Sequence, residues 1–310
     1  MNRPPGVHVK PLTIEHLDEI LEYWREAHPL HPMDAGLLRE RLFESGRSDP
    51  ELILAARDDG GRLVGMVRGD YPGGLAADAA GVRWLGVAPD WAEKGVETTL
   101  LDALVERLTR RGACKIYMLA SPPYYLRPGV DTRETGLIAT LLRLGWEHER
   151  TVFNMTVELA RWAMPGPDRI FGQDRSGYEV RRAMPTDEPP LSDLILRHWT
   201  RNWLEECRLA FRHDPIKLFV ATLGEEIVGF VAHEVNQCLG SYGPTGVAPF
   251  HRGTGLGRRL LWASLGELKR LGRPVCEIGW VGPVAFYHRA CGATLGPVYW
   301  VLKKDVVPEG

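Results

Sequence analysis

The sequence repeats itself at a spacing of 160 residues, and this repeat limits the possible folds more than any other feature. The tetrapeptide Gly-Val-Ala-Pro at residues 86–89 recurs at residues 246–249. Three further matches follow at the same spacing and in the same order: Gly95 with Gly255, the Leu-Leu pair 100–101 with 260–261, and Gly112 with Gly272. Several matches at one spacing indicate a repeated structural unit. We therefore expect two copies of one fold.

Both copies show the same order of expected elements. Each begins with a strand and helical segments, continues with a β-hairpin and a further strand, and then has an amphipathic helix with leucines three and four residues apart. Each closes with a strand, a helix and a strand. The expected fold class is α+β, with two tandem domains that each hold a mixed, mostly antiparallel central sheet flanked by helices.

The expected boundary between the copies is residues 161–177, which contain two prolines and three glycines. We therefore expect a first domain at 5–160, a linker at 161–177 and a second domain at 178–306. A length of 310 residues agrees with about two domains, and an apolar content of 44% is sufficient for two hydrophobic cores.

The charge and cysteine content exclude several protein classes. The net charge is −2, so the overall charge favours neither nucleic acid nor a membrane surface as a partner. The five cysteines are widely spaced and form no CxxC pair, which is typical of reduced thiols in a cytosolic protein. The sequence shows no signal peptide and no run of about 20 apolar residues, so we expect a soluble, cytoplasmic protein. His28 and His31 lack a third ligand, and we expect no metal site.

A glycine-rich loop in the second copy is the strongest functional signal. The segment Arg-Gly-Thr-Gly-Leu-Gly at residues 252–257 follows an expected strand and opens directly into the amphipathic helix. Glycines let backbone N–H groups approach an anion closely, and a helix N-terminus adds partial positive charge. Arg252, Arg258 and Arg259 supply cations. The spacing matches neither a dinucleotide-binding fingerprint nor a P-loop.

With its preceding Val-Ala-Pro, this loop resembles the acetyl-CoA signature of the GNAT N-acetyltransferase superfamily, and the element order of both copies resembles that fold. The resemblance implies acetyl-CoA as co-substrate. It also implies that the loop holds the coenzyme pyrophosphate, and that the end of the preceding strand lies beside the pantetheine and the acetyl carbonyl. The residues implied in these two roles are Arg252, Gly253, Thr254, Gly255, Leu256, Gly257 and Arg258 for the loop, and Val247 and Ala248 for the strand.

A second segment, Ala-Phe-Tyr-His-Arg-Ala-Cys-Gly at 285–292, is similar to a helix of the same family in which a tyrosine protonates the departing thiolate. The resemblance implies that Tyr287 is the general acid. The alternative is a helix tyrosine that packs against Phe286. The chain departs from the family pattern at Trp280, where relatives often have an asparagine that contacts the coenzyme.

The general base stays open at this level. Many relatives carry a glutamate on the strand before the loop, but residues 239–247 contain no acidic residue. The alternatives are Glu234, Glu277, His233 and a base that acts through water.

The first copy has lost these features. At the same spacing Ala92, Glu93 and Glu97 stand where the second copy has Arg252, Gly253 and Gly257, and Thr140 stands opposite Tyr287. Two carboxylates repel a pyrophosphate, so we expect the first domain to be non-catalytic.

Together these features predict an N-acetyltransferase that uses its second domain to acetylate a primary amine of a small molecule or peptide. Trp199 and Trp203 either line the acceptor pocket or pack in the core. Two other functions stay open: a non-catalytic protein that binds acyl-CoA, and an amide-forming acyltransferase that acts on a larger conjugate. The sequence predicts no oligomeric state.

Overall fold

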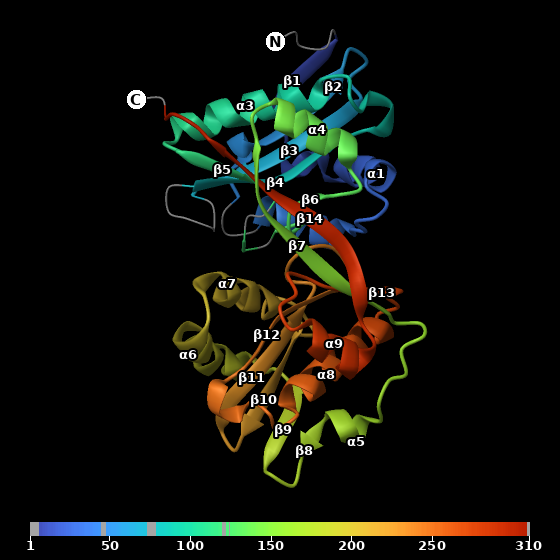
Figure 1. The fold of residues 1–310 in the computed structure, drawn as a ribbon, viewed down its shortest axis with the longest axis vertical. Coiled ribbons are helices and arrows are strands. Elements are labelled where there is room, and N and C mark those ends of the chain that lie inside the picture. The colour runs from blue at the N-terminus through green and yellow to red at the C-terminus, as the bar shows by residue number, and fades with distance from the viewer. Residues whose placement is uncertain (1–5, 45–47, 73–78, 120–121, 124, 309–310) are drawn as a thin grey trace. The chain divides into compact units, whose positions relative to one another are not determined.

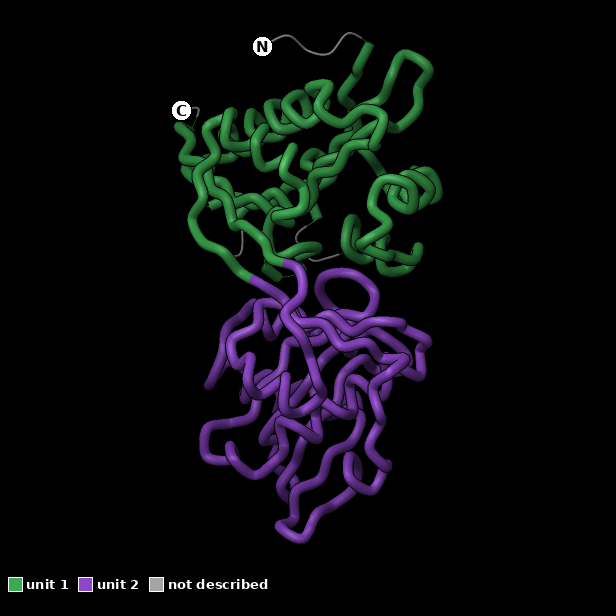
Figure 2. Tube along the Cα trace, turned by 45° about the vertical axis from the view of Figure 1, so that its right-hand side comes forward, with its two compact units in different colours: residues 1–152, 298–310 green, residues 153–297 purple. Residues whose placement is uncertain are grey.

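The computed structural model describes residues 6–44, 48–72, 79–119, 122–123 and 125–308. The chain divides into two compact units (Figure 2). Unit 1 comprises residues 1–152 and 298–310, and unit 2 comprises residues 153–297. Each unit has a mixed sheet with helices on its faces (Figure 1), as the sequence predicts.

Unit 1 contains five consecutive strands and receives the chain's last strand. Its strand order is β1-β2-β3-β4-β5-β14; all neighbours among β1 to β5 are antiparallel except β4 and β5, and β14 is antiparallel to β5. The short strand β6 pairs with β14. The elements are β1 (Val7–Pro11), η1 (Ile14–His16), α1 (Leu17–Ala27), α2 (Ala35–Arg39), η2 (Glu40–Glu44), η3 (Pro50–Leu52), β2 (Ile53–Asp58), β3 (Leu63–Asp70), β4 (Ala79–Val87), η4 (Pro89–Trp91), α3 (Val96–Arg110), β5 (Lys115–Met118), β6 (Val130–Asp131), α4 (Thr135–Arg143), the start of β7 (Glu147–Glu158) and the end of β14 (Thr294–Asp305).

Unit 2 repeats this plan. Its strand order is β8-β9-β10-β11-β12-β13-β7, and β12 and β13 are the parallel pair. The elements are α5 (Pro167–Ile170), β8 (Gly172–Gln173), β9 (Tyr178–Arg182), η5 (Pro185–Asp187), α6 (Glu188–His198), α7 (Arg201–Ala210), β10 (Leu218–Leu223), β11 (Glu226–His233), β12 (Ser241–Val247), η6 (Pro249–His251), α8 (Leu256–Arg270), β13 (Val275–Ile278) and α9 (Val284–Cys291), with the end of β7 and the start of β14.

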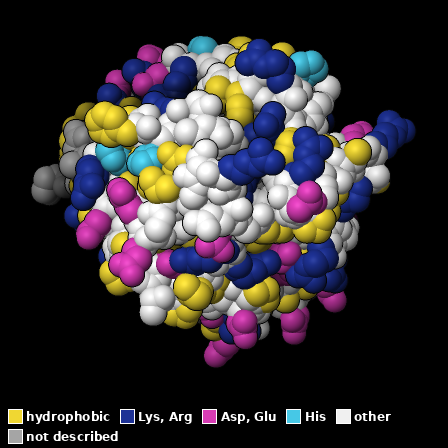
Figure 3. Space-filling view, turned by 90° about the horizontal axis from the view of Figure 1, so that it is seen from below, with side chains coloured by type: hydrophobic (Ala, Val, Ile, Leu, Met, Phe, Trp, Pro, Cys, Tyr) yellow, Lys and Arg dark blue, Asp and Glu magenta, His cyan; other side chains and the backbone are white. Residues whose placement is uncertain are grey.

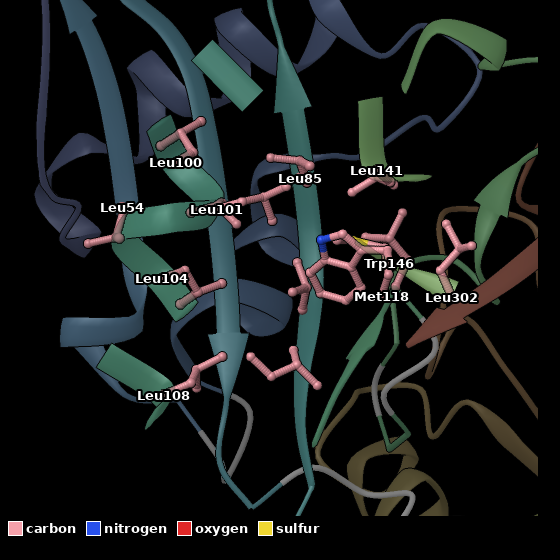
Figure 4. Packing of buried hydrophobic residues seen from close by; sticks show 14 of the residues in the cluster. Leu54, Leu85, Leu100, Leu101, Leu104, Leu108, Met118, Leu141, Trp146 and Leu302 are labelled. Carbon is pink, nitrogen blue, oxygen red and sulfur yellow. The ribbon is translucent and has the colours of Figure 1, made fainter. Parts of the chain in front are cut away.

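Each unit has one long helix whose leucines pack on the sheet. In unit 1 the leucines of α3 lie against β2, β3 and β4 and form the core (Figure 4). Helix α8 does the same in unit 2. Gly95 and Gly255, each in the left-handed region at φ of about 90°, precede these helices, and Gly112 and Gly272 follow them with positive φ, as the repeat predicts. A side chain at any of these positions would be strained.

The last strand of each unit comes from the other half of the chain, which differs from the expected domain division. Residues 155–158 of β7 pair with β13 in unit 2, and residues 302–305 of β14 pair with β5 in unit 1. These pairings give hydrogen-bond partners to backbone N–H and C=O groups along one edge of β13 and one edge of β5. The expected division into domains at 5–160 and 178–306 did not include this exchange of strands. Pairing between strands more than 100 residues apart leaves no local pattern in the sequence.

Residues 161–177, expected to be a linker, are also part of unit 2. They contain α5 and β8, and β8 pairs with β9. Arg259 of α8 holds this segment by donating to the carbonyl oxygens of Ile170 and Gly172 and to the carboxylate of Asp174. The prolines and glycines therefore shape a packed segment, because a side chain distant in sequence supplies its hydrogen bonds.

Candidate active site

The candidate site lies where β12 ends and α8 begins. Gly253 and Gly255 both have positive φ, which lets the chain turn tightly from η6 into the helix. The amide N–H groups of Gly253, Thr254 and Gly255 donate to no other group among the described residues. At the start of α8, the N–H groups of Leu256 and Gly257 likewise have no carbonyl partner in the helix, whereas the N–H of Arg258 donates to the carbonyl of Gly255 at 3.1 Å. The loop thus presents a row of available donors at a helix N-terminus, which suits an anion.

A cavity of about 600 Å³ opens at this loop. It is lined by Val247, His251, Arg252, Gly253, Thr254, Gly255, Leu256, Gly257, Arg258, Phe286, Arg289 and Ala290. The structure therefore brings together eight of the nine residues expected to bind coenzyme and leaves out Ala248. The volume lies in the ordinary range for a small-molecule site.

Ala248 directly follows β12 and does not line the cavity, because its N–H and its side chain are both engaged elsewhere. Its N–H donates to the carbonyl of Val228 at 2.8 Å, and its side chain is buried among the residues of α6, α7 and the sheet. Since successive N–H groups of a strand point to opposite edges, the N–H of Val247 points away from β11. Of these two strand residues, Val247 therefore offers an amide toward the site.

Sequence reasoning missed four lining residues. Phe286, Arg289 and Ala290 share α9, and His251 ends η6, where its Nδ1 lies 3.0 Å from the hydroxyl of Tyr178. The i, i+3 spacing of Phe286 and Arg289, next to the tyrosine, was the available signal, because it places both on one helix face.

The three arginines of the loop have different surroundings. Arg252 donates from Nε to the carbonyl of Val247 at 3.1 Å, and Arg258 lies over the ring of Trp262 at 5.0 Å; both line the cavity. Arg259 points instead to the α5–β8 segment that it anchors. The cations available at the cavity are therefore Arg252, Arg258 and Arg289.

Strands β12 and β13 separate beside this cavity. They pair only at Ser241 with Glu277 and Tyr242 with Ile278, although β12 continues to Val247. The edge of β12 that faces β13 is therefore unpaired by that strand from Gly243 onward. Such an opening lets an extended ligand lie beside strand backbone, as an added strand does.

Tyr287 lies at the point of separation. Its ring packs edge-on against Tyr242, the last residue of β12 paired with β13, with ring centroids 5.9 Å apart. The side chain is buried in the core of unit 2 and is not part of the cavity lining. Burial raises the pKa of its hydroxyl. Tyr287 therefore stays protonated at neutral pH and is able to donate a proton.

The three candidate bases lie outside the cavity lining. Burial acts to raise the pKa of Glu234, but hydrogen bonds from Arg273 and from the N–H of Gly240 lower it overall. Burial lowers the pKa of His233 to about 4, so that its ring is neutral. Glu277 accepts a hydrogen bond from Asn154. In these surroundings Glu234 and Glu277 serve as hydrogen-bond acceptors of the fold.

Unit 2 has a second cavity, of about 540 Å³, with a different character. It is lined mainly by apolar residues of α8 and its neighbours, including Phe171 and Phe219. Its charged groups are engaged: Glu267 pairs with Arg182 and Arg270, and Lys269 donates to the carbonyl of Trp162. The glycine-rich cavity is therefore the better candidate for an anionic ligand.

Among the residues that the structure describes, no group of three His, Cys, Asp or Glu side chains is arranged to hold a metal ion. Within the same residues, no helix combines the length and apolar character needed to cross a bilayer. On the face that Figure 3 shows, Lys and Arg side chains are interspersed with Asp and Glu side chains.

A family model described as the acetyltransferase (GNAT) family matches residues 14–126 and 180–293. The chain belongs to this family. The two matched regions correspond to the two copies of the repeat, so the expected tandem arrangement is confirmed.

Curated relatives match about a third of this GNAT chain. A mycothiol acetyltransferase of Clavibacter sepedonicus is 35% identical over 113 residues, which are 35% of this chain and 36% of the relative. An acetyltransferase of Sodalis glossinidius is 30% identical over 106 residues, 34% of this chain and 69% of the relative. This chain thus spans about a third of the length of the mycothiol acetyltransferases.

Solved structures with the same fold cover nearly the whole chain. A tandem GNAT protein from the clavulanic acid biosynthesis pathway has a TM-score of 0.69 at 18% identity and covers 98% of this chain and 100% of its own. A GCN5-related N-acetyltransferase from Sphaerobacter thermophilus has the same TM-score at 17% identity. The match covers 100% of this chain and 98% of the Sphaerobacter chain. At 17–18% identity, these two similarities show the fold alone.

The corresponding loop in unit 1 of this GNAT protein is closed by its own side chain. A carboxylate oxygen of Glu97, on the first turn of α3, accepts the backbone N–H of Glu93 at 3.3 Å. Glu93 itself has a positive φ of 60°, and its carboxylate lies so near Gly136 that a Cβ there would be 2.3 Å away. The Glu97 carboxylate therefore lies in the unit 1 loop, at positions where the corresponding loop of unit 2 has glycines.

Proposed function

We propose that unit 2 is the catalytic domain, and that it transfers the acetyl group of acetyl-CoA to a primary amine of a small molecule or peptide. One observation carries this proposal: residues 253–257 supply unpaired amides at a cavity beside the separated strands β12 and β13. In unit 1 the same loop is closed by Glu97. Unit 1 is then a non-catalytic copy.

The residues of the cavity fit coenzyme A. The positive φ of Gly253 and Gly255 turns the loop tightly into α8, and unpaired amides at a helix N-terminus suit a pyrophosphate. Arg252, Arg258 and Arg289 add the positive charge that the helix N-terminus alone supplies only in part. The pantetheine would lie along the free edge of β12, with Val247 in reach.

Acetyl-CoA supplies an acetyl group as a thioester. The N–H of Val247, directed away from β11, polarises the acetyl carbonyl as the amine attacks. Tyr287 then donates its proton to the departing sulfur, because burial keeps the hydroxyl protonated. The described residues place no carboxylate on the cavity wall, so we assign deprotonation of the amine to water.

The acceptor approaches from the α6–α7 side of β12. Trp199 lies on Gly246 so closely that a Cβ there would come within 2.4 Å of its ring, and Trp203 stacks on Trp199 with centroids 6.0 Å apart. Phe230 meets the same ring edge-on at 5.3 Å. Trp199 and Trp203 are partly buried against the core of α6, α7 and the sheet, and we propose that they also form the wall that an acceptor amine would meet.

A second candidate acceptor is a larger amine-bearing conjugate. The similarity to mycothiol acetyltransferases over 113 residues favours it. A third possibility is a protein that binds acyl-CoA without turnover, which the absence of an acidic residue from residues 239–247 favours. In each case we place the protein in the cytoplasm.

The test is thiol release from acetyl-CoA by the full chain, measured against a panel of small amines, peptides and larger conjugates. Turnover with a small amine or peptide supports the proposal, and turnover with conjugates alone supports the second candidate. Coenzyme binding without turnover on the whole panel contradicts catalysis.

A further inference from the structure

Asn154 is a buried amide next to the segment of β7 that pairs with β13. It lies on β7, in the portion of that strand that joins unit 2, and its exposed fraction is 0%. The first half of the expected domain division thus supplies a residue to the second unit. A buried amide must have its donors and acceptor satisfied, so its partners reveal what it holds.

The partners of Asn154 come from β13, from the turn that follows it and from the connection between β11 and β12. Its Nδ2 donates to Gln237 at 2.9 Å and to Glu277 of β13. Its Oδ1 accepts the backbone N–H of Trp280 at 3.0 Å. The next amide, that of Val281, donates to the carbonyl of Phe153 at 3.2 Å. Two adjacent residues of β7 therefore hold two adjacent amides of one turn.

That turn connects β13 to α9 and contains a strained residue. Trp280 has φ of +46°, in the left-handed region that a bulky side chain rarely adopts. Such a conformation persists only where its surroundings enforce it. Helix α9 begins four residues later at Val284 and carries Phe286 and Tyr287. The direction of the turn thus decides where these two side chains lie.

We propose that Asn154 is a positioning residue of the acetyl transfer: by holding the Trp280 turn, it sets the placement of Tyr287 on α9. This inference rests on the proposed function of unit 2.

Two substitutions separate the hydrogen bonds. Asn154→Ala removes all of them. Asn154→Asp keeps an acceptor for Trp280 but sets a carboxylate against Glu277, and adding Glu277→Gln restores a donor–acceptor pair with reversed polarity. We expect each single variant to lower kcat at least tenfold with the KM for acetyl-CoA changed less than twofold, and the combined variant to recover to within threefold of the wild type.

A double-mutant cycle tests whether Asn154 acts through Tyr287. Asn154→Ala added to Tyr287→Phe should reduce kcat no further than Tyr287→Phe alone, because the acid it positions is already absent. Thr156→Val, on the same strand, is the matched control and should leave kcat unchanged. Multiplying losses in the cycle, or unchanged kcat in the Asn154 variants, would overturn the inference.

Hydrogen exchange gives a readout without turnover. In Asn154→Ala, which removes the acceptor of the Trp280 N–H, the amides of Trp280 and Val281 in this turn should exchange faster, while those of β11 keep their wild-type rates. If the wild type releases no thiol with any amine, the proposed function fails, and exchange still decides whether Asn154 holds the turn. Unchanged exchange at both amides counts against it.

Discussion

The carboxylate of Glu97 accepts a hydrogen bond from the N–H of Glu93 at 3.3 Å, within the loop whose counterpart in unit 2 contains Gly253 and Gly257. In unit 1 the negatively charged group at this loop is therefore a side chain of the protein itself, the carboxylate of Glu97. The duplicated fold has kept its helix and its preceding strand, but a side chain now satisfies the loop amide that a pyrophosphate would use. Giving this loop the residues of its counterpart in unit 2 should therefore open it.

The first prediction concerns that replacement. The wild-type chain should bind one coenzyme A, since only unit 2 has an open loop. Combining Ala92→Arg, Glu93→Gly and Glu97→Gly should add a second, weaker site, because two repelling carboxylates are removed and one cation is gained. Isothermal titration calorimetry measures the number of coenzyme A molecules bound by the wild type and by the triple variant. A wild-type stoichiometry of two would contradict the assignment.

The second prediction concerns the general acid. Tyr287→Phe should lower kcat by roughly 10²-fold with coenzyme affinity nearly unchanged, because a positioned acid acts on the leaving group and not on binding. The raised pKa of Tyr287 also means that its deprotonation should produce no loss of kcat up to about pH 10. Tyr23→Phe, which removes a buried hydroxyl from unit 1, is the control. Equal kcat in both variants would refute the role.

The third prediction separates two neighbouring arginines. Arg252→Glu should weaken coenzyme A binding at least tenfold, about 1.4 kcal/mol, by placing a like charge beside the pyrophosphate. Arg259→Gln should lower the melting temperature instead, since it frees the α5–β8 segment, and should leave the affinity of the folded protein nearly unchanged. Binding isotherms and thermal unfolding of both variants distinguish these effects. The loop assignment fails if Arg252→Glu retains wild-type affinity.

The fourth prediction is a loss of stability in acid. The hydrogen bond from Arg270 lowers the pKa of Glu267 to about 2, below its usual 4.5, so its contribution is complete above about pH 4.5 and is lost as the pH falls toward 2. Burial lowers the pKa of His233 to about 4, so the unfolded state binds this proton first and stability declines from about pH 6.5 to 4. We expect the melting temperature of His233→Gln to depend less on pH between about 6.5 and 4, and that of Glu267→Gln to depend less on pH between about 4.5 and 2. Parallel curves for variant and wild type would exclude these sources.

The fifth prediction follows from the strand that β7 supplies. A fragment of residues 178–306 lacks residues 155–158, so the edge of β13 would lose its partner and apolar residues of β7 would be missing from the core. We expect this fragment to unfold without a cooperative transition, whereas a fragment of residues 150–297 should show one. Denaturant titration of the two fragments makes the comparison, and cooperative unfolding of the shorter one would be the contrary result.

Much of the fold was accessible from local pattern. The leucine spacing of α3 and α8, the glycines at their ends and the repeat at 160 residues each depend on neighbours within a few turns of chain, and each is found in the structure. The glycine-rich loop was likewise visible, because positive φ and close backbone approach require glycine at fixed positions.

Other features arose only from contacts distant in sequence. Nothing around Arg259 distinguishes it from Arg252, yet one anchors a segment more than 80 residues away and the other lines the cavity. Ala248 matched the family pattern, but the sheet register assigned its N–H to Val228. The sequence by itself determined two copies of a GNAT fold and which copy kept its loop, since these depend on residue identity. The exchange of last strands and the place of Asn154 were decided by tertiary structure, because strand partners and buried hydrogen bonds are chosen by what folding brings together.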